Sequence, residues 1–276
     1  MHNHLPLALV QMTASEDVAE NIAMASGLIR AAARDGAALI ATPEMTSLLT
    51  QSRTTLLATT KAETDDPALA AFRALSSTLQ RWLLIGSLPI RVAAQAVVNR
   101  SFLLAPDGAI AARYDKIHMF DVDLPDGESY RESRLYRPGE AAVVAPTPWG
   151  LVGLTICYDL RFAGLYRHLA QAGARAIAVP AAFTRQTGAA HWHVLMRARA
   201  IETGCFIFAP AQTGRHPSNR ETYGHSLIVS PWGEVIADGG EAVGLVQATL
   251  DLAEVDAARQ RIPALRHERQ FTAAAP

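Results

Sequence analysis

Stretches with the pattern of buried strands alternate along the chain with stretches that have the pattern of helices, and this alternation constrains the fold most strongly. Apolar runs at 5–12 and 37–42 flank a helical segment that begins near Ser15 and ends at Gly36. Such an order of elements is typical of layered α/β folds, in which helices cover a sheet. The chain has 276 residues, half of them hydrophobic, so it can bury the large core that this fold class needs.

The remaining elements follow the same order. A hairpin is expected from two apolar runs, 97–105 and 109–114, because Pro106-Asp-Gly108 between them is a turn sequence. We find no linker, low-complexity tract or internal repeat that would divide the chain. The other expected helices are 67–80, 163–173 and 189–203, and the other expected strands are 82–88, 152–156, 176–180, 205–212, 224–230, 234–238 and 244–249.

Composition argues against several classes of function. The chain has 25 basic and 26 acidic residues and no dense basic run, which argues against nucleic acid as a partner. It has no uninterrupted apolar run of about 18 residues, so no membrane span is expected. The N-terminus lacks the pattern of a signal peptide. One of the two cysteines is assigned to chemistry below and Cys205 is left unpaired, which fits the reducing cytoplasm.

Cys157 stands where the apolar pattern of 152–156 changes to polar sequence. A thiol at the end of a strand, just before a helix, can be held rigidly and still face a ligand. The alternative is a buried cysteine that packs as a small hydrophobic residue. The segment alone leaves both interpretations open.

Two charged residues stand at similar positions. Glu44 follows the run 37–42 and Pro43, which has no N–H to donate to a strand ladder, and Lys116 follows the strand expected at 109–114. Taken singly, each is more simply a solvated surface residue. Together with Cys157, they give three reactive side chains that each lie where a buried strand ends.

These three segments resemble the motifs of the carbon–nitrogen hydrolase (nitrilase) superfamily. The similarity lies in Thr42-Pro-Glu44, Tyr114-Asp-Lys-Ile-His118 and Ile156-Cys-Tyr-Asp-Leu-Arg-Phe162, in the order of that family's Glu-Lys-Cys triad. The resemblance extends over nearly the whole chain. It implies an α/β fold built as a four-layer α-β-β-α sandwich and a single domain over 1–276. It also implies a homodimer whose interface includes the C-terminal tail, about 251–276.

The resemblance also implies a role for each residue. Cys157 would attack an amide carbonyl as a thiolate, and Glu44 would take the thiol proton and later protonate the departing amine. Lys116 and the backbone N–H of Tyr158 would stabilise the oxyanion, and the lysine charge would favour the thiolate. Glu132 resembles the family's second glutamate, which orients the lysine; the alternative is a solvated glutamate between two arginines. No metal and no other cofactor is implied.

The C-terminal third guides the expectation about the substrate. The stretches 189–203, 211–216 and 220–234 resemble the branch of the superfamily that hydrolyses deaminated glutathione. That branch releases 2-oxoglutarate and Cys-Gly and thereby repairs a metabolite. Nitrilases, ω-amidases acting on 2-oxoglutaramate and N-carbamoyl amino acid hydrolases carry the same triad and stay as alternatives. A catalytically silent scaffold would not need all three triad residues.

A small anionic substrate needs cations in its pocket. Arg161, four residues after the cysteine, is a candidate carboxylate clamp, and its alternative is a structural ion pair with Asp159. The segment 126–130 is a candidate lid over the pocket. Further candidates for substrate binding are His118, Phe183, Thr184, Arg185, Arg215 and His216.

Other chemistries have weaker support. His191 and His193 are two residues apart, so on a helix they face different directions and make a poor metal pair. His118, Asp121 and Asp123 have a metal-like composition, but we interpret them as structural or pocket-lining. The Gly-x-Ser-x-Gly elbow of serine hydrolases is absent from the sequence. A papain-like Cys-His pair is compatible with the sequence geometry and is disfavoured by the family resemblance.

Overall fold

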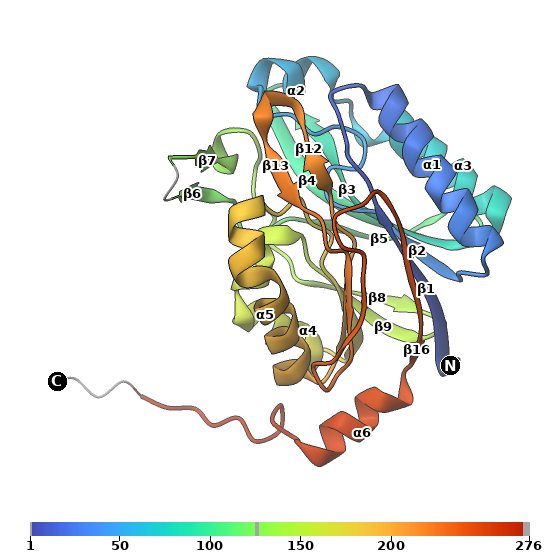
Figure 1. Ribbon diagram of the computed structural model, residues 1–276, viewed down its shortest axis with the longest axis vertical. Helices are drawn as coiled ribbons and strands as arrows, with labels where there is room; N and C mark the ends of the chain where they lie inside the picture. Colours follow the sequence, from blue (N-terminus) through green and yellow to red (C-terminus); the bar gives the residue numbers. More distant parts are fainter. Residues whose placement is uncertain (1, 125–126, 273–276) are drawn as a thin grey trace.

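Two β-sheets of six strands each pack together at the centre of the computed structural model, which describes residues 2–124 and 127–272 (Figure 1). Each sheet has three parallel strands at its centre and antiparallel strands toward its edges. In spatial order, the first sheet consists of β16 (Gly244–Asp251), β1 (His4–Gln11), β2 (Leu39–Ala41), β3 (Trp82–Ala93), β4 (Ala96–Leu104) and β5 (Ile110–Asp115). The second consists of β15 (Val235–Asp238), β14 (Leu227–Val229), β11 (Phe206–Ala209), β10 (Ala174–Ala178), β9 (Gly150–Leu154) and β8 (Val143–Thr147).

Helices cover the outer face of each sheet. The first sheet is covered by α1 (Val18–Arg34) and α3 (Pro67–Leu79), and the second by α4 (Ala163–Gln171) and α5 (Arg185–Thr203) (Figure 1). The layers therefore follow the order helix, sheet, sheet, helix. This arrangement confirms the α-β-β-α sandwich expected from the sequence.

Strand β1 shows why the sequence reads as continuous apolar runs. Leu7 and Leu9 belong to the core between the two sheets, whereas Ala8 and Val10 pack in the second core, with Ile29 of α1. Successive side chains of a strand point to opposite faces, and here both faces are buried. The strand is therefore apolar at every position instead of at every second one.

Two helices begin at other residues than the sequence predicted. The N-cap of α1 is Asp17, whose carboxylate accepts hydrogen bonds from the first turn, and not Ser15, whose hydroxyl accepts the N–H of Asp17. Helix α5 begins at Arg185 instead of residue 189, with Thr184 as its N-cap. Gly36, with φ of +95°, follows α1 where its end was expected.

Short elements that the sequence pattern did not predict gather at one end of the sandwich (Figure 1). Their polar sequences are too short for a periodic signal. They are α2 (Arg53–Thr59), the hairpin of β6 (Asp121–Asp123) and β7 (Ser129–Arg131), and the hairpin of β12 (Thr213–Arg215) and β13 (Glu221–Tyr223). Within the described parts of the chain, four 3₁₀ turns complete the connections: η1 (Glu63–Asp65), η2 (Glu132–Arg134), η3 (Cys157–Arg161) and η4 (Pro217–Asn219).

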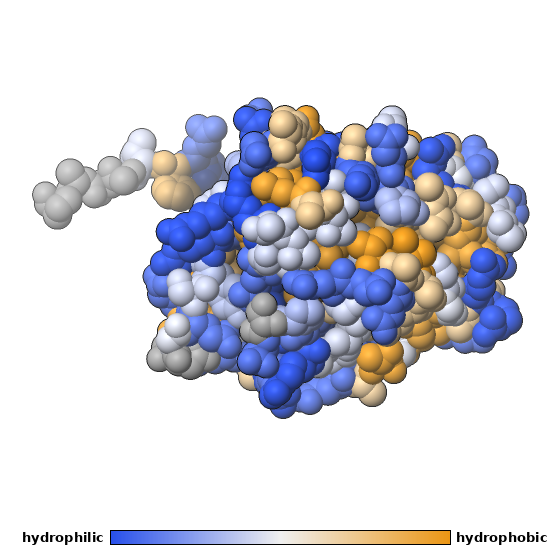
Figure 2. All heavy atoms as spheres, turned by 90° about the horizontal axis from the view of Figure 1, so that it is seen from above, coloured by the Kyte–Doolittle hydropathy of each residue, from blue (hydrophilic) through white to orange (hydrophobic). Residues whose placement is uncertain are grey.

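The opposite end of the sandwich carries α6 (Ala253–Arg261), and beyond it the chain projects from the body (Figures 1 and 2). Phe271 in this projecting segment is 93% exposed. The last residues of the expected tail, 273–276, lie outside the described part of the chain. Among the described helices, none is both long enough and apolar enough to cross a membrane.

The parallel central strands of both sheets and β5 point their carboxyl ends to the end that carries the small hairpins, and four of them lead into the segments of the site. These are β2 and β5 of the first sheet and β9 and β10 of the second. Loops at the carboxyl ends of parallel strands are the usual place for a site in α/β folds. The segments that follow these strands contain Glu44, Lys116 and Cys157.

Candidate active site

Glu44 lies buried just beyond β2. The backbone before it packs so closely on β3 that a Cβ at Gly86 would lie 2.1 Å from the carbonyl oxygen of Thr42, so this position requires glycine. One carboxylate oxygen accepts the backbone N–H of Ala182 at 2.8 Å, and the other accepts the side-chain amide of Asn99 at 2.9 Å. The carboxylate of Glu44 is therefore fixed by both sheets.

Lys116 follows β5, and its side chain is only 2% exposed. Its Nζ donates to Oε1 of Glu44 at 2.9 Å and to both oxygens of Glu132 at 2.9 and 2.8 Å. Glu132, at the start of η2, also accepts the backbone N–H of Phe120 at 2.7 Å. One ammonium group is thus held between two carboxylates.

Cys157 begins the turn η3 after β9, and its φ of +50° is left-handed. Residues other than glycine rarely adopt this conformation, and they keep it where the surrounding structure fixes them. The N–H of Cys157 donates to the carbonyl of Pro180 at 2.9 Å, and the thiol forms a hydrogen bond with Glu44. The thiol therefore meets the carboxylate at the junction of the two sheets.

Asp159 joins the segment of Lys116 to the segment of Cys157. Its Oδ2 accepts the hydroxyl of Tyr114 at 2.7 Å and the N–H of Ile156 at 2.8 Å. Its Oδ1 accepts both the backbone N–H and Nδ1–H of His118, at 3.0 and 2.7 Å. Since Tyr114 and His118 flank the lysine in sequence, this buried carboxylate fixes the lysine relative to the cysteine turn.

Opposite charges keep Glu44 and Lys116 ionised. Burial raises the pKa of Glu44, but the charge and hydrogen bond of Lys116, the hydrogen bond with Cys157 and the charge of Arg220 lower that pKa below its usual value. Burial lowers the pKa of Lys116, and the charges of Glu132 and Glu44 raise it well above the usual value. The resting site therefore holds an ammonium and a carboxylate.

The cysteine behaves differently from the sequence-based expectation. The charge of Lys116 lowers the pKa of the Cys157 thiol, as expected, but burial and the negative charge of Glu44 raise that pKa well above its usual value. The resting group is therefore a neutral thiol whose proton faces an ionised carboxylate. A preformed thiolate would need a less buried position or a weaker negative neighbour.

A cavity of about 460 Å³ opens beside these residues. It lies at the end of the sandwich that carries the hairpins, the end that Figure 2 views, where hydrophobic and hydrophilic side chains are intermixed. Cavities of this size are suited to small molecules. The lining consists of Glu44, Met45, Leu49, Thr50, Gln51, Arg53, Lys116, Phe120, Ser129, Tyr130, Arg131, Glu132, Arg134, Leu135, Tyr136, Cys157, Tyr158, Ala182, Phe183, Thr184, Thr187 and Arg220.

Some of the expected substrate-binding residues belong to this lining. Phe183 and Thr184 line the cavity, and so does Tyr158, whose backbone N–H was expected to belong to the oxyanion hole. Of the segment expected to form a lid, Ser129 and Tyr130 also line it, whereas Asp126 lies outside the described residues.

The other candidates lie elsewhere among the described residues. His118 is bonded to Asp159, and its ring stacks on Phe162 with centroids 3.5 Å apart. The Arg161 guanidinium lies over the rings of Tyr158 and Phe183, 5.8 and 5.4 Å from their centroids.

No ion pair joins Arg161 to Asp159 within the described parts of the chain; Arg161 instead lies 3.3 Å from Nδ1 of His191 on the neighbouring helix α5. Arg185 and Arg215 both extend to acidic residues at the surface, Glu241 and Glu221 respectively. His216 is buried against the carbonyl of Ala14 and the hydroxyl of Thr222.

Three further site residues escaped the sequence analysis. Asn99, from the middle of β4, and the N–H of Ala182 hold Glu44, and Arg220 lines the cavity. A polar residue inside the apolar strand 97–105 was a signal for Asn99, since a buried amide needs partners. Neither Ala182 nor Arg220 carries such a signal, because a backbone N–H and a hairpin arginine look ordinary in sequence.

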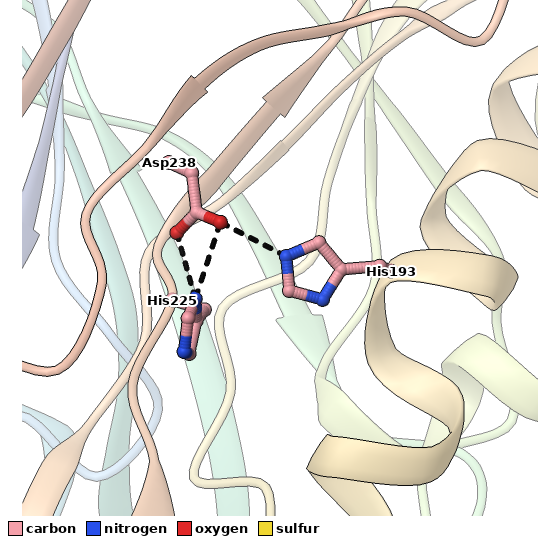
Figure 3. A group of neighbouring side chains, drawn as sticks. All are labelled: His193, His225 and Asp238. Carbon is pink, nitrogen blue, oxygen red and sulfur yellow. Dashed lines mark hydrogen bonds and ion pairs between the residues drawn. The ribbon is translucent and has the colours of Figure 1, made fainter.

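The histidine pair considered in the sequence analysis does not come together. His193 lies beside His225 and Asp238, and not beside His191 (Figure 3). His225 precedes β14, and Asp238 ends β15. The carboxylate accepts His193 Nε2–H at 2.9 Å and His225 Nδ1–H at 2.9 Å. This group joins α5 to β15 and lies apart from the cavity lining.

The sandwich and its buried cysteine, carboxylate and ammonium are features of one class of protein. The sequence model of the carbon–nitrogen hydrolase family matches residues 6–260, and the chain belongs to this family. It is therefore a hydrolase of amide carbon–nitrogen bonds.

Individual proteins of this family are similar to the chain over nearly its whole length. A protein of Yersinia enterocolitica named deaminated glutathione amidase is 39% identical over 273 residues, which are 98% of this chain and 95% of the relative. A protein of the same name from Synechocystis is 42% identical over 267 residues, 94% of this chain and 96% of the relative. The crystal structure of the Caenorhabditis elegans NitFhit protein has a TM-score of 0.89 and 34% identity. That match covers 97% of this chain and 65% of the longer NitFhit chain.

Proposed function

We propose that this protein is a cysteine amidase that hydrolyses the γ-amide of deaminated glutathione to 2-oxoglutarate and Cys-Gly. The observation that carries the chemistry is the meeting of Glu44, Lys116 and Cys157 at one wall of a cavity. The choice of substrate is supported by the names of relatives that align with nearly the whole chain. Removal of a damaged form of glutathione is the metabolic role that follows.

Acylation uses the neutral thiol and the ionised carboxylate described above. Glu44 takes the thiol proton as the sulfur of Cys157 attacks the amide carbon, and the carbonyl oxygen gains negative charge. The ammonium of Lys116 and the N–H of Tyr158 stabilise that oxygen, and each such donor contributes about 3 kcal/mol to lowering the barrier. When the carbon–nitrogen bond breaks, protonated Glu44 gives its proton to the departing amine, and a thioester remains on Cys157.

Hydrolysis of the thioester reverses the proton path. Glu44, again ionised, takes a proton from water as the water oxygen attacks the thioester carbon. The carbon–sulfur bond then breaks, the carboxylic acid leaves, and Cys157 regains its proton from Glu44. Glu132 acts as a positioning residue, because it holds the Lys116 ammonium by two hydrogen bonds.

The protein is also proposed to be a single cytoplasmic domain that forms a homodimer. Exposed apolar residues support an interface beside the cysteine turn and the C-terminal segment. Val194 and Ile201 of α5 and Ile262 after α6 are each more than half exposed, and the segment that follows projects from the body. A second copy would bury these side chains, and sedimentation of the purified protein tests the association.

The decisive experiment compares 2-oxoglutarate release from deaminated glutathione and from 2-oxoglutaramate, with Cys157→Ala as the control. We expect the peptide to be strongly preferred and Cys157→Ala to be inactive and folded. A preference for 2-oxoglutaramate would assign an ω-amidase instead. Turnover of neither compound would redirect the search to N-carbamoyl and other small amides. A Cys157→Ala variant with full turnover would refute the nucleophile.

A further inference from the structure

Arg220 lies in the wall of the active-site cavity, next to the catalytic carboxylate. It follows η4 in the hairpin of β12 and β13, and its Nη2 donates to the carbonyl of Ala182 at 2.6 Å. The N–H of the same Ala182 donates to Glu44. One residue therefore links the guanidinium to the carboxylate that acts on the thiol.

The guanidinium of Arg220 has unused capacity for hydrogen bonds. No carboxylate of the described residues forms an ion pair with it, and its Nε is buried without a hydrogen-bond partner in that part of the chain. The ring of Tyr130, another lining residue, lies 5.4 Å from the guanidinium carbon. The Nε atom is closed off from the cavity, so an anion there would bind instead to Nη1, which has no acceptor among the described residues, and to the second N–H of Nη2.

Other arginines at this end differ from Arg220. Arg131 is paired with Asp123, and Arg215 is exposed and paired with Glu221. Arg53 and Arg134 line the cavity from exposed positions, and Arg53 donates to the backbone carbonyl of Arg134. Arg220 combines partial burial, a place in the lining and a link to Glu44.

We propose that Arg220 binds a carboxylate on the acyl part of the substrate and so selects amides of dicarboxylic acids. A planar guanidinium offers two parallel N–H groups to a carboxylate, which adds both affinity and orientation. The acyl part fits this position better than the leaving group. In deaminated glutathione, the carboxylate of the acyl part is separated from the amide carbon by a short carbon chain, whereas that of glycine lies beyond the whole cysteine residue. This inference rests on the proposed function.

Kinetics of matched substrates test the role. We expect Arg220→Met to lower kcat/KM for 2-oxoglutaramate about tenfold to a hundredfold more than kcat/KM for neutral butyramide, because only the anionic substrate loses a charge-assisted contact. Arg220→Lys, which keeps the charge without the fork, should fall between Arg220→Met and the wild type. Arg215→Met, an exposed arginine of the same hairpin, is the control and should behave as the wild type. Equal losses on both substrates would overturn the proposal.

A second measurement is independent of the physiological substrate. Cys157 is alkylated with iodoacetate, an anion, and with iodoacetamide, its neutral analogue, and the modification is followed by mass spectrometry. Arg220→Met should lower the ratio of the two rates at least tenfold, and glutarate should protect the wild type only. If the ratio falls while no 2-oxo acid amide is turned over, the anion site stands and the proposed substrate fails. An unchanged ratio in Arg220→Met and Arg220→Lys, with native circular dichroism, would overturn the anion site.

Discussion

Replacing Asp159 with asparagine should separate the lysine segment from the cysteine turn without changing the size of the side chain. Oδ1 accepts two groups of His118, and Oδ2 accepts Tyr114 and Ile156. The asparagine amide keeps one of these two oxygens as an acceptor and has an NH₂ group, which only donates, in place of the other. The ring of His118 or the hydroxyl of Tyr114 can turn to accept from the new NH₂, but the backbone N–H on that side cannot.

The expected loss of stability follows from the number of donors that lose their acceptor. Whichever way the amide is placed, one buried backbone N–H, of His118 or of Ile156, loses its acceptor. Such a loss costs about 1–3 kcal/mol, which for a chain of this size corresponds to a fall in Tm of roughly 2–10 °C. Asp159→Ala leaves all four donors without an acceptor and should be clearly less stable than Asp159→Asn.

The assay combines urea unfolding with steady-state kinetics. Asp159→Asn should lower both the free energy of unfolding and kcat, because the Lys116 ammonium and the Cys157 thiol lose their common anchor. Asp121→Asn, which changes an exposed carboxylate on β6 bonded to the N–H of Ser133, is the matched control. Wild-type kcat in a destabilised Asp159→Asn would show that Asp159 supports only the fold. Wild-type stability would refute the hydrogen-bond argument.

Three other perturbations give distinct outcomes. Lys116→Met removes the charge and the hydrogen bond that lower the pKa of Glu44, so that pKa should rise. Steady-state assays should show kcat lower by about 10²–10³, and a loss of less than tenfold would contradict the oxyanion role. Glu44→Gln removes a charge that raises the thiol pKa. The rate of Cys157 alkylation by iodoacetamide, followed by mass spectrometry across pH, should therefore rise at lower pH than in the wild type even as turnover is lost, and an unshifted pH profile would show that the charge of Glu44 does not set the thiol pKa. Burial lowers the pKa of His216 from 6.5 to about 4, so between these pH values the unfolded chain binds a proton that the native state does not. The free energy of unfolding should fall by on the order of 3 kcal/mol as pH drops through this window. His216→Gln should reduce that slope in urea titrations, and an unchanged slope would assign it to other groups.

The fold was predictable where strands are buried on both faces. Continuous apolar runs such as that of β1 can be recognised without any alternation of polar residues. The hairpin of β6 and β7 was missed because its polar strands are three residues long and pack over a cavity instead of a core. The start of α1 was misplaced because Ser15 and Asp17 are both good caps, and only the backbone geometry selects Asp17.

The site was partly predictable for a related reason. Glu44, Lys116 and Cys157 each follow an apolar strand pattern, and the resemblance of their three segments to the motifs of one family is what singled them out in the sequence. The cations of the cavity did not stand out, because charge alone does not say which way a side chain extends. Arg185 and Arg215 extend to surface carboxylates, whereas the Arg220 guanidinium lies over the ring of Tyr130 in the cavity lining.

The two sheets contribute different halves of the site, and the chain crosses between them once before the cysteine. Glu44 and Lys116 come from the first sheet, and Cys157 comes from the second, after the exposed stretch 140–142. Strand β16, from the far end of the chain, pairs with β1 along its whole length. A chain cut at 140–142 would yield two fragments that each lack part of the site. When the fragments associate, β16 of the second fragment pairs with β1 of the first. Turnover would then return only on reassembly, so the divided enzyme could serve as a reporter of proximity between two fused partners.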